Sequence, residues 1–213
     1  MSTREKTMSE AAAAEVHGHG AIVDQTEPSL TPGNSGKLGM WVFLAGDAMT
    51  FGAGIAAYGA LRYQNVNWPD PADWLGISLT AVMTYILICS SVTMVEALSG
   101  IHHGNIRKMQ GFLALTVLGG IAFLGCQAFE WHHLIWGEHL SIKTSLFSAT
   151  FFILTGFHGM HVTGGVIYLG TLLARSFQRP FAVADAKLVE IAGLYWHFVD
   201  LVWILIFTFV YLI

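Results

Sequence analysis

Charged residues are scarce in this sequence. Lys, Arg, Asp and Glu make up 11% of its 213 residues, whereas hydrophobic residues make up 54%. A water-soluble domain normally carries about 25% charged residues. The ten basic residues are scattered along the chain and form no tract that would indicate a nucleic-acid partner. The composition therefore excludes an ordinary soluble domain and favours a membrane protein.

Cysteine and catalytic motifs are also scarce. Cys89 and Cys126 both fall inside apolar runs, so we expect buried free thiols and no disulfide framework or cysteine metal site. The sequence has no nucleophile elbow, Walker loop, dinucleotide fingerprint or HExxH zinc motif. It therefore indicates no independent catalytic centre in this chain.

Residues 1–36 contain no apolar run, so they do not form the hydrophobic region of a cleavable signal peptide. We predict a polar, flexible tail there, followed by one membrane domain over residues 37–213. His17 and His19 form a His-x-His pair in this tail, for which a solvated segment is favoured over weak metal binding.

Five long apolar runs follow the tail. Each is long enough to cross the roughly 30 Å hydrocarbon core of a bilayer as a helix. None shows the two-residue alternation of a membrane barrel strand. The predicted fold class is therefore all-α, a polytopic bundle of five transmembrane helices. The predicted helices span residues 38–61, 75–98, 109–130, 145–173 and 189–213.

The basic residues orient this bundle. With five spans, the side that holds the N-terminal tail carries eight Lys and Arg residues, and the other side carries only two, Arg62 and Lys143. Basic residues accumulate in cytoplasmic loops. We therefore predict a cytoplasmic N-terminus and a periplasmic C-terminus. The eight are Arg4, Lys6, Lys37, Arg107, Lys108, Arg175, Arg179 and Lys187.

Five ionisable residues fall near the middle of these runs: Asp47, His158, His161, His197 and Asp200. Such groups are costly inside a membrane and often functional, so each requires a partner, a buried face or a water cavity. Three interpretations follow from the residues alone: structural pairing between helices or contact with lipid, a proton-conducting chain, and a metal site of two histidines with a carboxylate. No third ligand follows the two neighbouring histidines at a fixed spacing, which argues against the metal.

Two further features concern the helix surfaces and the outer edge. Glu130 lies near the outer interface, where it could complete a carboxylate–histidine site or simply be hydrated. Small residues recur at four-residue spacing in the first and fourth runs, through Gly52 and Ala56 and through Gly159 and Thr163. Such stripes let another helix approach closely, so we predict helix packing at these positions.

Four motifs, in order along the chain, resemble a known family. They are WVFLAGDAMTFGAGIAAY, FLGCQAFEWHHLI with its Gln-x-x-Glu-aromatic pattern, GFHGMHVTGG and YWHFVDLVWILIF. Together they resemble subunit III of the haem-copper terminal oxidases, over residues 37–213 and in all five helices. The chain is similar to the short five-helix bacterial members, since the two N-terminal helices of the seven-helix members are absent.

The resemblance implies a non-redox accessory subunit of a proton-pumping oxidase in a bacterial inner membrane. It implies that haem and copper belong to partner subunits, and that this chain packs on subunit I, with subunit II and a small subunit IV in the same complex. It also implies bound phospholipid and a role in sustaining proton uptake and stability during turnover. The family's carbodiimide-reactive carboxylate corresponds to Asp47. Its other polar positions correspond to Glu130, His158, His161, Trp196, His197 and Asp200.

The resemblance leaves the electron donor open, because cytochrome c oxidases and quinol oxidases share this subunit. An accessory subunit of a nitric oxide reductase is a further alternative. A free-standing proton-coupled carrier is the competing class, and the sequence shows no inverted repeat to favour it.

Overall fold

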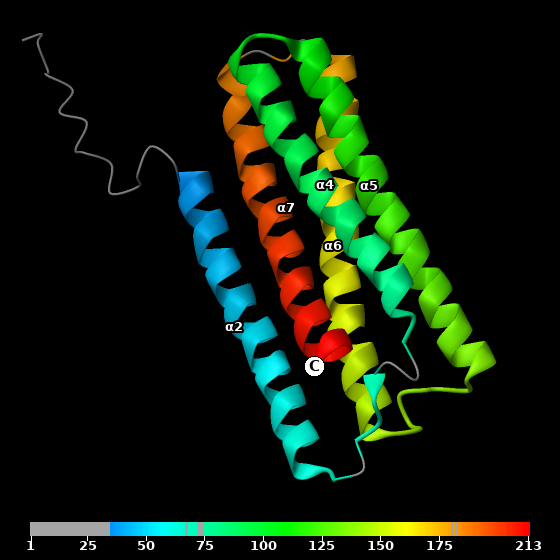
Figure 1. Cartoon of the computed structure of the whole chain (residues 1–213). Helices are drawn as coiled ribbons and strands as arrows, with labels where there is room; N and C mark the ends of the chain where they lie inside the picture. Colours follow the sequence, from blue (N-terminus) through cyan, green and yellow to red (C-terminus); the bar gives the residue numbers. More distant parts are fainter. Residues whose placement is uncertain (1–34, 67, 72–74, 180, 182) are drawn as a thin grey trace, which may run out of the picture. The chain divides into compact units, whose positions relative to one another are not determined.

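The computed structural model describes residues 35–66, 68–71, 75–179, 181 and 183–213 (Figure 1). Residues 1–34 of the predicted tail, with His17 and His19, lie outside the described residues. The described part forms five helices long and apolar enough to cross a membrane, and it contains no β-strand. The predicted all-α class with five spans is thus confirmed, and the sidedness of the termini stays a prediction. The helices are α2 (Ser35–Gln64), α4 (Ile77–His102), α5 (Ile106–His132), α6 (Leu146–Gln178) and α7 (Ala186–Ile206).

The helix ends differ from the ends of the apolar runs because capping groups decide where a helix begins and ends. The α5 helix begins three residues before the predicted Met109, since the Asn105 side chain accepts a hydrogen bond from the Lys108 N–H at 3.0 Å. The α4 helix continues past Leu98 until the chain turns at Gly104, whose φ of 70° suits a residue without a Cβ.

Two helices end in a wider π-helical turn. The α5 helix continues as η1 (His133–Gly137), and α7 continues as η3 (Phe207–Leu212). In a π-helical turn the backbone hydrogen bonds join residues five apart instead of four. Such turns often occur at functional sites. In this chain, η3 brings Tyr211 into the buried interior.

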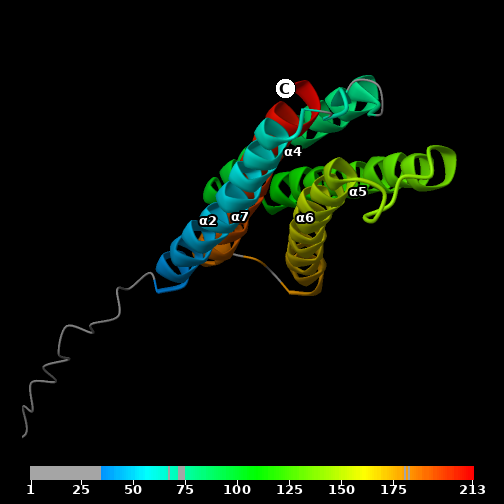
Figure 2. The ribbon, with the colours of Figure 1, turned by 90° about the horizontal axis from the view of Figure 1, so that it is seen from below.

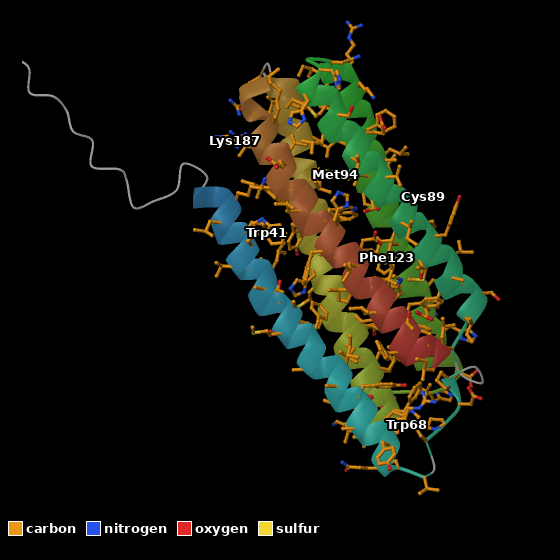
Figure 3. All side chains as sticks on the ribbon, turned by 60° about the vertical axis from the view of Figure 1, so that its left-hand side comes forward. Trp41, Trp68, Cys89, Met94, Phe123 and Lys187 are labelled. Atoms are coloured by element: carbon orange, nitrogen blue, oxygen red, sulfur yellow. The ribbon has the colours of Figure 1, made fainter. Side chains whose placement is uncertain are left out.

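Four of the helices form a closed ring in which each helix packs against two others. The α4 helix contacts α5 and α7, and α6 contacts the same two helices from the other side (Figures 1 and 2). Small residues bring α4 and α5 very close together: a Cβ added to Gly100 would lie 2.8 Å from the Met109 backbone nitrogen. Large side chains such as Phe123 and Met94 fill the interior of the ring (Figure 3).

The α2 helix joins this ring mainly through large side chains. The ring of Phe51 lies 4.8 Å from that of Phe157 on α6, and Phe43 lies 6.3 Å from Tyr195 on α7. Most of the remaining α2 surface is exposed within this chain. The helix therefore presents a broad apolar face to lipid or to other polypeptides.

The expectation of buried thiols is wrong for Cys89. Its side chain is exposed on the outer face of α4, and Cys126 is half-buried (Figure 3). An apolar run fixes the depth of a residue in the membrane, but it does not fix which side of the helix faces lipid.

Candidate functional site

Asp47 on α2 and His161 on α6 come together although they lie 114 positions apart in the chain. The carboxylate Oδ2 lies 3.2 Å from the imidazole Nε2, and the two side chains are 15% and 13% exposed. This is an ion-pair distance, but the alignment is not that of a hydrogen bond. The pair links α2 to the four-helix ring in the middle of the membrane-spanning segments.

The surroundings of His161 determine how many protons the pair holds. Its Nδ1 lies 2.8 Å from the carbonyl oxygen of Phe157, which can only accept, so Nδ1 carries a hydrogen. In a neutral imidazole the other nitrogen is then an acceptor, and an ionised carboxylate is also an acceptor. A favourable contact therefore needs one proton between Nε2 and Oδ2. Whichever atom carries that proton, the net charge of the pair is zero.

His158 lies about one turn before His161 on α6 but has no polar partner. Its side chain is fully buried, with its ring 4.9 Å from the Trp203 ring and 5.7 Å from the Phe123 ring. Neither ring nitrogen has a hydrogen-bond partner. Within the described residues, no hydrogen bond connects His158 to the pair that Asp47 and His161 form.

Trp196 on α7 packs tightly into the ring of helices. Its Nε1–H donates to the Ser90 hydroxyl on α4 at 3.0 Å. Its six-membered ring occupies space that two glycines leave free, because a Cβ on Gly120 or Gly165 would lie 2.6 Å or 2.9 Å from ring carbons. Trp196 on α7 therefore contacts α4, α5 and α6 and stabilises the packing of all four helices.

His197 and Asp200, one turn apart on α7, both face Ser91 on α4. The Ser91 hydroxyl lies 2.5 Å from the His197 Nδ1 and is also a hydrogen-bonding neighbour of the Asp200 carboxyl group. The second Asp200 oxygen, Oδ1, is buried and has no partner. The five intramembrane residues thus divide into an Asp47–His161 pair, an isolated His158, and a Ser91–His197–Asp200 group.

Glu130 is buried rather than hydrated, with 4% of its surface exposed. Its Oε1 accepts a hydrogen bond from the Thr80 hydroxyl at 3.1 Å, and its Oε2 accepts one from the Tyr211 hydroxyl at 3.0 Å. The carboxyl group therefore joins α4, α5 and the C-terminal η3 turn. The interpretation of Glu130 as an edge residue that water hydrates does not describe this arrangement.

The two small-residue stripes lie in different environments. Gly52 and Ala56 are exposed, and a Cβ on Gly52 would meet no atom within 4 Å, so no described helix of this chain packs on that stripe. Gly159 lies against α5, where a Cβ would be 3.0 Å from the Gln127 side chain. Thr163 is exposed and donates its hydroxyl hydrogen to the Gly159 carbonyl oxygen at 2.8 Å.

Several polar partners were not singled out from the sequence. Thr80, Ser91 and Tyr211 lie in apolar runs and give no signal of their own, since hydroxyl residues are common in membrane helices. Gln127 is part of the Gln-x-x-Glu-aromatic pattern, so that motif could have indicated it. Its Nε2–H donates to the Thr155 carbonyl oxygen on α6 at 2.8 Å.

The described residues contain no group of three or more His, Cys, Asp or Glu side chains that could hold a metal ion. They define a polytopic α-helical membrane protein whose buried polar residues connect helices.

Comparison with known proteins identifies the family. The family model for cytochrome c oxidase subunit III matches residues 34–213. Cytochrome c oxidase subunit 3 of Alkalihalophilus pseudofirmus is 36% identical over 186 residues, which cover 87% of this chain and 90% of that protein. The Bacillus subtilis protein of the same name is 36% identical over 84% of this chain and 87% of its own length. Quinol oxidase subunit 3 of Bacillus subtilis is 32% identical, covering 91% and 95% of the two chains.

The chain belongs to the cytochrome c oxidase subunit III family. The resemblance seen in the sequence motifs is thereby confirmed. Membership makes this chain a membrane subunit of a haem-copper oxidase complex, of the cytochrome c or the quinol type.

Proposed function

We propose that this chain is the non-redox accessory subunit of a proton-pumping haem-copper terminal oxidase in a bacterial inner membrane. The observation that carries the proposal is the match to the subunit III family over residues 34–213, with five membrane-spanning helices. In this proposal the chain packs on subunit I, and subunit II and a small subunit IV complete the complex. Haem and copper reside in the partner subunits, and electrons enter those subunits from cytochrome c or quinol.

The proposed contribution of this chain is to sustain proton uptake and stability over many turnovers. Asp47 and His161 support this role, because they bring a carboxyl group and an imidazole, two groups that can exchange protons, into contact at mid-depth. The exposed apolar face of α2 and the groove between α2 and α7 support phospholipid binding. That groove is lined by Trp41, Leu44, Ala45, Ala48, Leu194, His197, Phe198 and Leu201.

A strain that lacks this chain tests the proposal. The oxidase is purified with and without the chain, and its visible spectrum, subunit pattern and oxygen consumption are recorded through prolonged turnover. We expect unchanged haem bands and initial rate, followed by faster loss of activity without the chain. Full activity through prolonged turnover in its absence would refute the stabilising role.

The electron donor is a separate question with two candidates. Similarity to both a cytochrome c oxidase subunit 3 and a quinol oxidase subunit 3 supports each of them. The donor binds other subunits, so oxygen consumption by the purified complex with reduced cytochrome c or with a quinol decides between them. A free-standing proton-coupled carrier is the remaining alternative. Purification of this chain as a stable oligomer without any haem-bearing partner would support it.

A further inference from the structure

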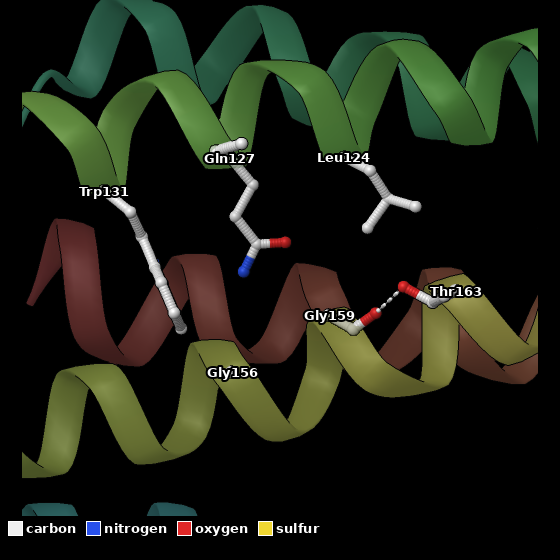
Figure 4. A pocket seen from close by; sticks show the side chains of 7 residues that line it. Leu124, Gln127, Trp131, Gly156, Gly159 and Thr163 are labelled. Atoms are coloured by element: carbon white, nitrogen blue, oxygen red, sulfur yellow. Dashed lines mark hydrogen bonds between the residues drawn. The ribbon is translucent and has the colours of Figure 1, made fainter.

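A cavity of about 230 Å³ lies between α5 and α6 and is distinct from the Asp47–His161 pair (Figure 4). Gln127 and Trp131 reach into it from α5. On α6 its wall consists of Gly156, Gly159 and Thr163. A wall of such small residues lets a neighbouring side chain or helix come close to the α6 backbone.

The Gln127 amide has a defined orientation. Its nitrogen must face the Thr155 carbonyl oxygen, 2.8 Å away, because that oxygen can only accept a hydrogen bond. The amide oxygen Oε1 therefore faces the cavity, and it is buried without a partner, on a side chain that is only 6% exposed. The Thr163 hydroxyl does not meet this need, because its hydrogen is directed to the Gly159 carbonyl oxygen at 2.8 Å.

The depth of the cavity limits what can supply the missing donor. The midpoint of α6 is Val162, so Gly156 lies about 9 Å from the middle of the helix at 1.5 Å per residue. The hydrocarbon core extends about 15 Å on either side of the bilayer centre. Acyl chains at this depth carry no hydrogen-bond donor, whereas polar side chains of transmembrane helices do.

We propose that this cavity receives a side chain from a transmembrane helix of another oxidase subunit, and that this side chain donates a hydrogen bond to the Gln127 Oε1 atom. The partner side chain is one that has an O–H or N–H donor, such as Ser, Thr, Asn or Trp. Gln127 and Trp131 already cover Gly159 and Gly156, so the partner side chain enters beside them, and the unpaired acceptor fixes its register. This proposal rests on the oxidase complex proposed above and adds the surface through which one partner is held.

Site-specific photocrosslinking within the intact, purified oxidase tests the proposal. A benzophenone amino acid is placed at Ala128, which is exposed and lines the cavity, and, as a control, at Ala81, which is exposed on α4 away from it. We expect the Ala128 probe to join this chain to one transmembrane peptide of another subunit, identified by mass spectrometry, with a donor residue at the level of Gln127. An adduct of lipid mass at Ala128, or no polypeptide adduct, overturns the proposal.

A pair of matched substitutions gives a second readout. Ala128→Phe fills the mouth of the cavity, and Ala81→Phe makes the same change elsewhere. After a mild detergent wash, we expect at least a threefold larger release of this chain from the haem-bearing subunits for Ala128→Phe than for Ala81→Phe, and equal release overturns the proposal. Replacing the donor on the partner with an apolar residue is expected to give about a threefold effect, the size typical of one hydrogen bond in a membrane.

These experiments separate the two proposals. If the unmodified chain does not purify with a haem-bearing complex, the proposed function fails. If it does purify with one but the Ala128 probe reaches only lipid, the function stands and the docking surface is refuted.

Discussion

Substitutions at Asp47 and His161 offer the sharpest test of how the intramembrane polar residues stabilise the packing of the helices. Asp47→Leu removes the carboxylate that lies 3.2 Å from the His161 Nε2 atom and places an apolar side chain there, while Nδ1 keeps its contact with the Phe157 carbonyl oxygen. An unpaired buried acceptor costs about 1–3 kcal/mol. Both side chains keep some exposure, 15% and 13%, so we expect a loss near the lower end, about 1 kcal/mol.

The matched control is Asp47→Asn. The Asn amide has a permanent N–H donor, which can occupy the position of the single proton between the two side chains. We therefore expect Asp47→Asn to keep most of the stability that Asp47→Leu loses. A difference of about 1 kcal/mol corresponds to about a fivefold change in an equilibrium constant, which is measurable.

Denaturant-induced release of this chain from the purified complex in mild detergent measures these differences. Asp47→Leu, His161→Leu and the double variant form a double-mutant cycle, and we expect a coupling energy of about 1 kcal/mol. The inference of one shared proton is refuted if Asp47→Asn loses as much stability as Asp47→Leu. A coupling energy near zero would show that the Asp47–His161 contact does not stabilise the packing of α2 against the other helices.

Three further predictions concern packing and reactivity. Gly120→Ala should lower stability by about 1–3 kcal/mol, because its Cβ would lie 2.6 Å from a buried tryptophan ring. The control Gly52→Ala should leave stability nearly unchanged, and thermal unfolding of the complex compares the two variants. Tyr211→Phe should cost about 1–3 kcal/mol in the same assay, since it leaves one Glu130 oxygen buried without its donor, and an unchanged transition would contradict this. A hydrophobic carbodiimide should label Asp47 rather than Glu130, because Glu130 is 4% exposed and hydrogen-bonded through both oxygens. Peptide mass mapping locates the label, and labelling of Glu130 in place of Asp47 would contradict this.

The sequence predicted the number of spans, the approximate depth of each ionisable residue and the family. Hydropathy predicts the spans and the depths, because a segment that crosses the hydrocarbon core must be largely apolar over about 20 positions. The four motifs predicted the family. For Asp47 and His161 the same patterns left structural pairing, a proton path and a metal site open, and for Gly159 they predicted helix packing. They did not distinguish His161, which meets a carboxylate, from His158, which lies among aromatic rings.

The partners of Glu130 and the packing of the small-residue stripes also could not be predicted. Thr80 and Tyr211 are distant from Glu130 in the chain, and the η3 turn that delivers Tyr211 has no sequence signature. Gly52 and Gly159 belong to similar stripes, yet one is exposed and the other meets Gln127. Hydropathy is nearly uniform around these helices, so no amphipathic pattern marks the side of each helix that faces its neighbours.

The sequence by itself therefore determined a five-helix membrane subunit with polar residues at predicted depths, since depth follows from position along a helix. Only the tertiary structure decided which of these residues meet. That outcome depends on the rotation of each helix about its axis and on the neighbours it selects. It gave Asp47 a partner in His161, left His158 without one, and turned the oxygen of Gln127 toward a cavity that a second polypeptide can fill.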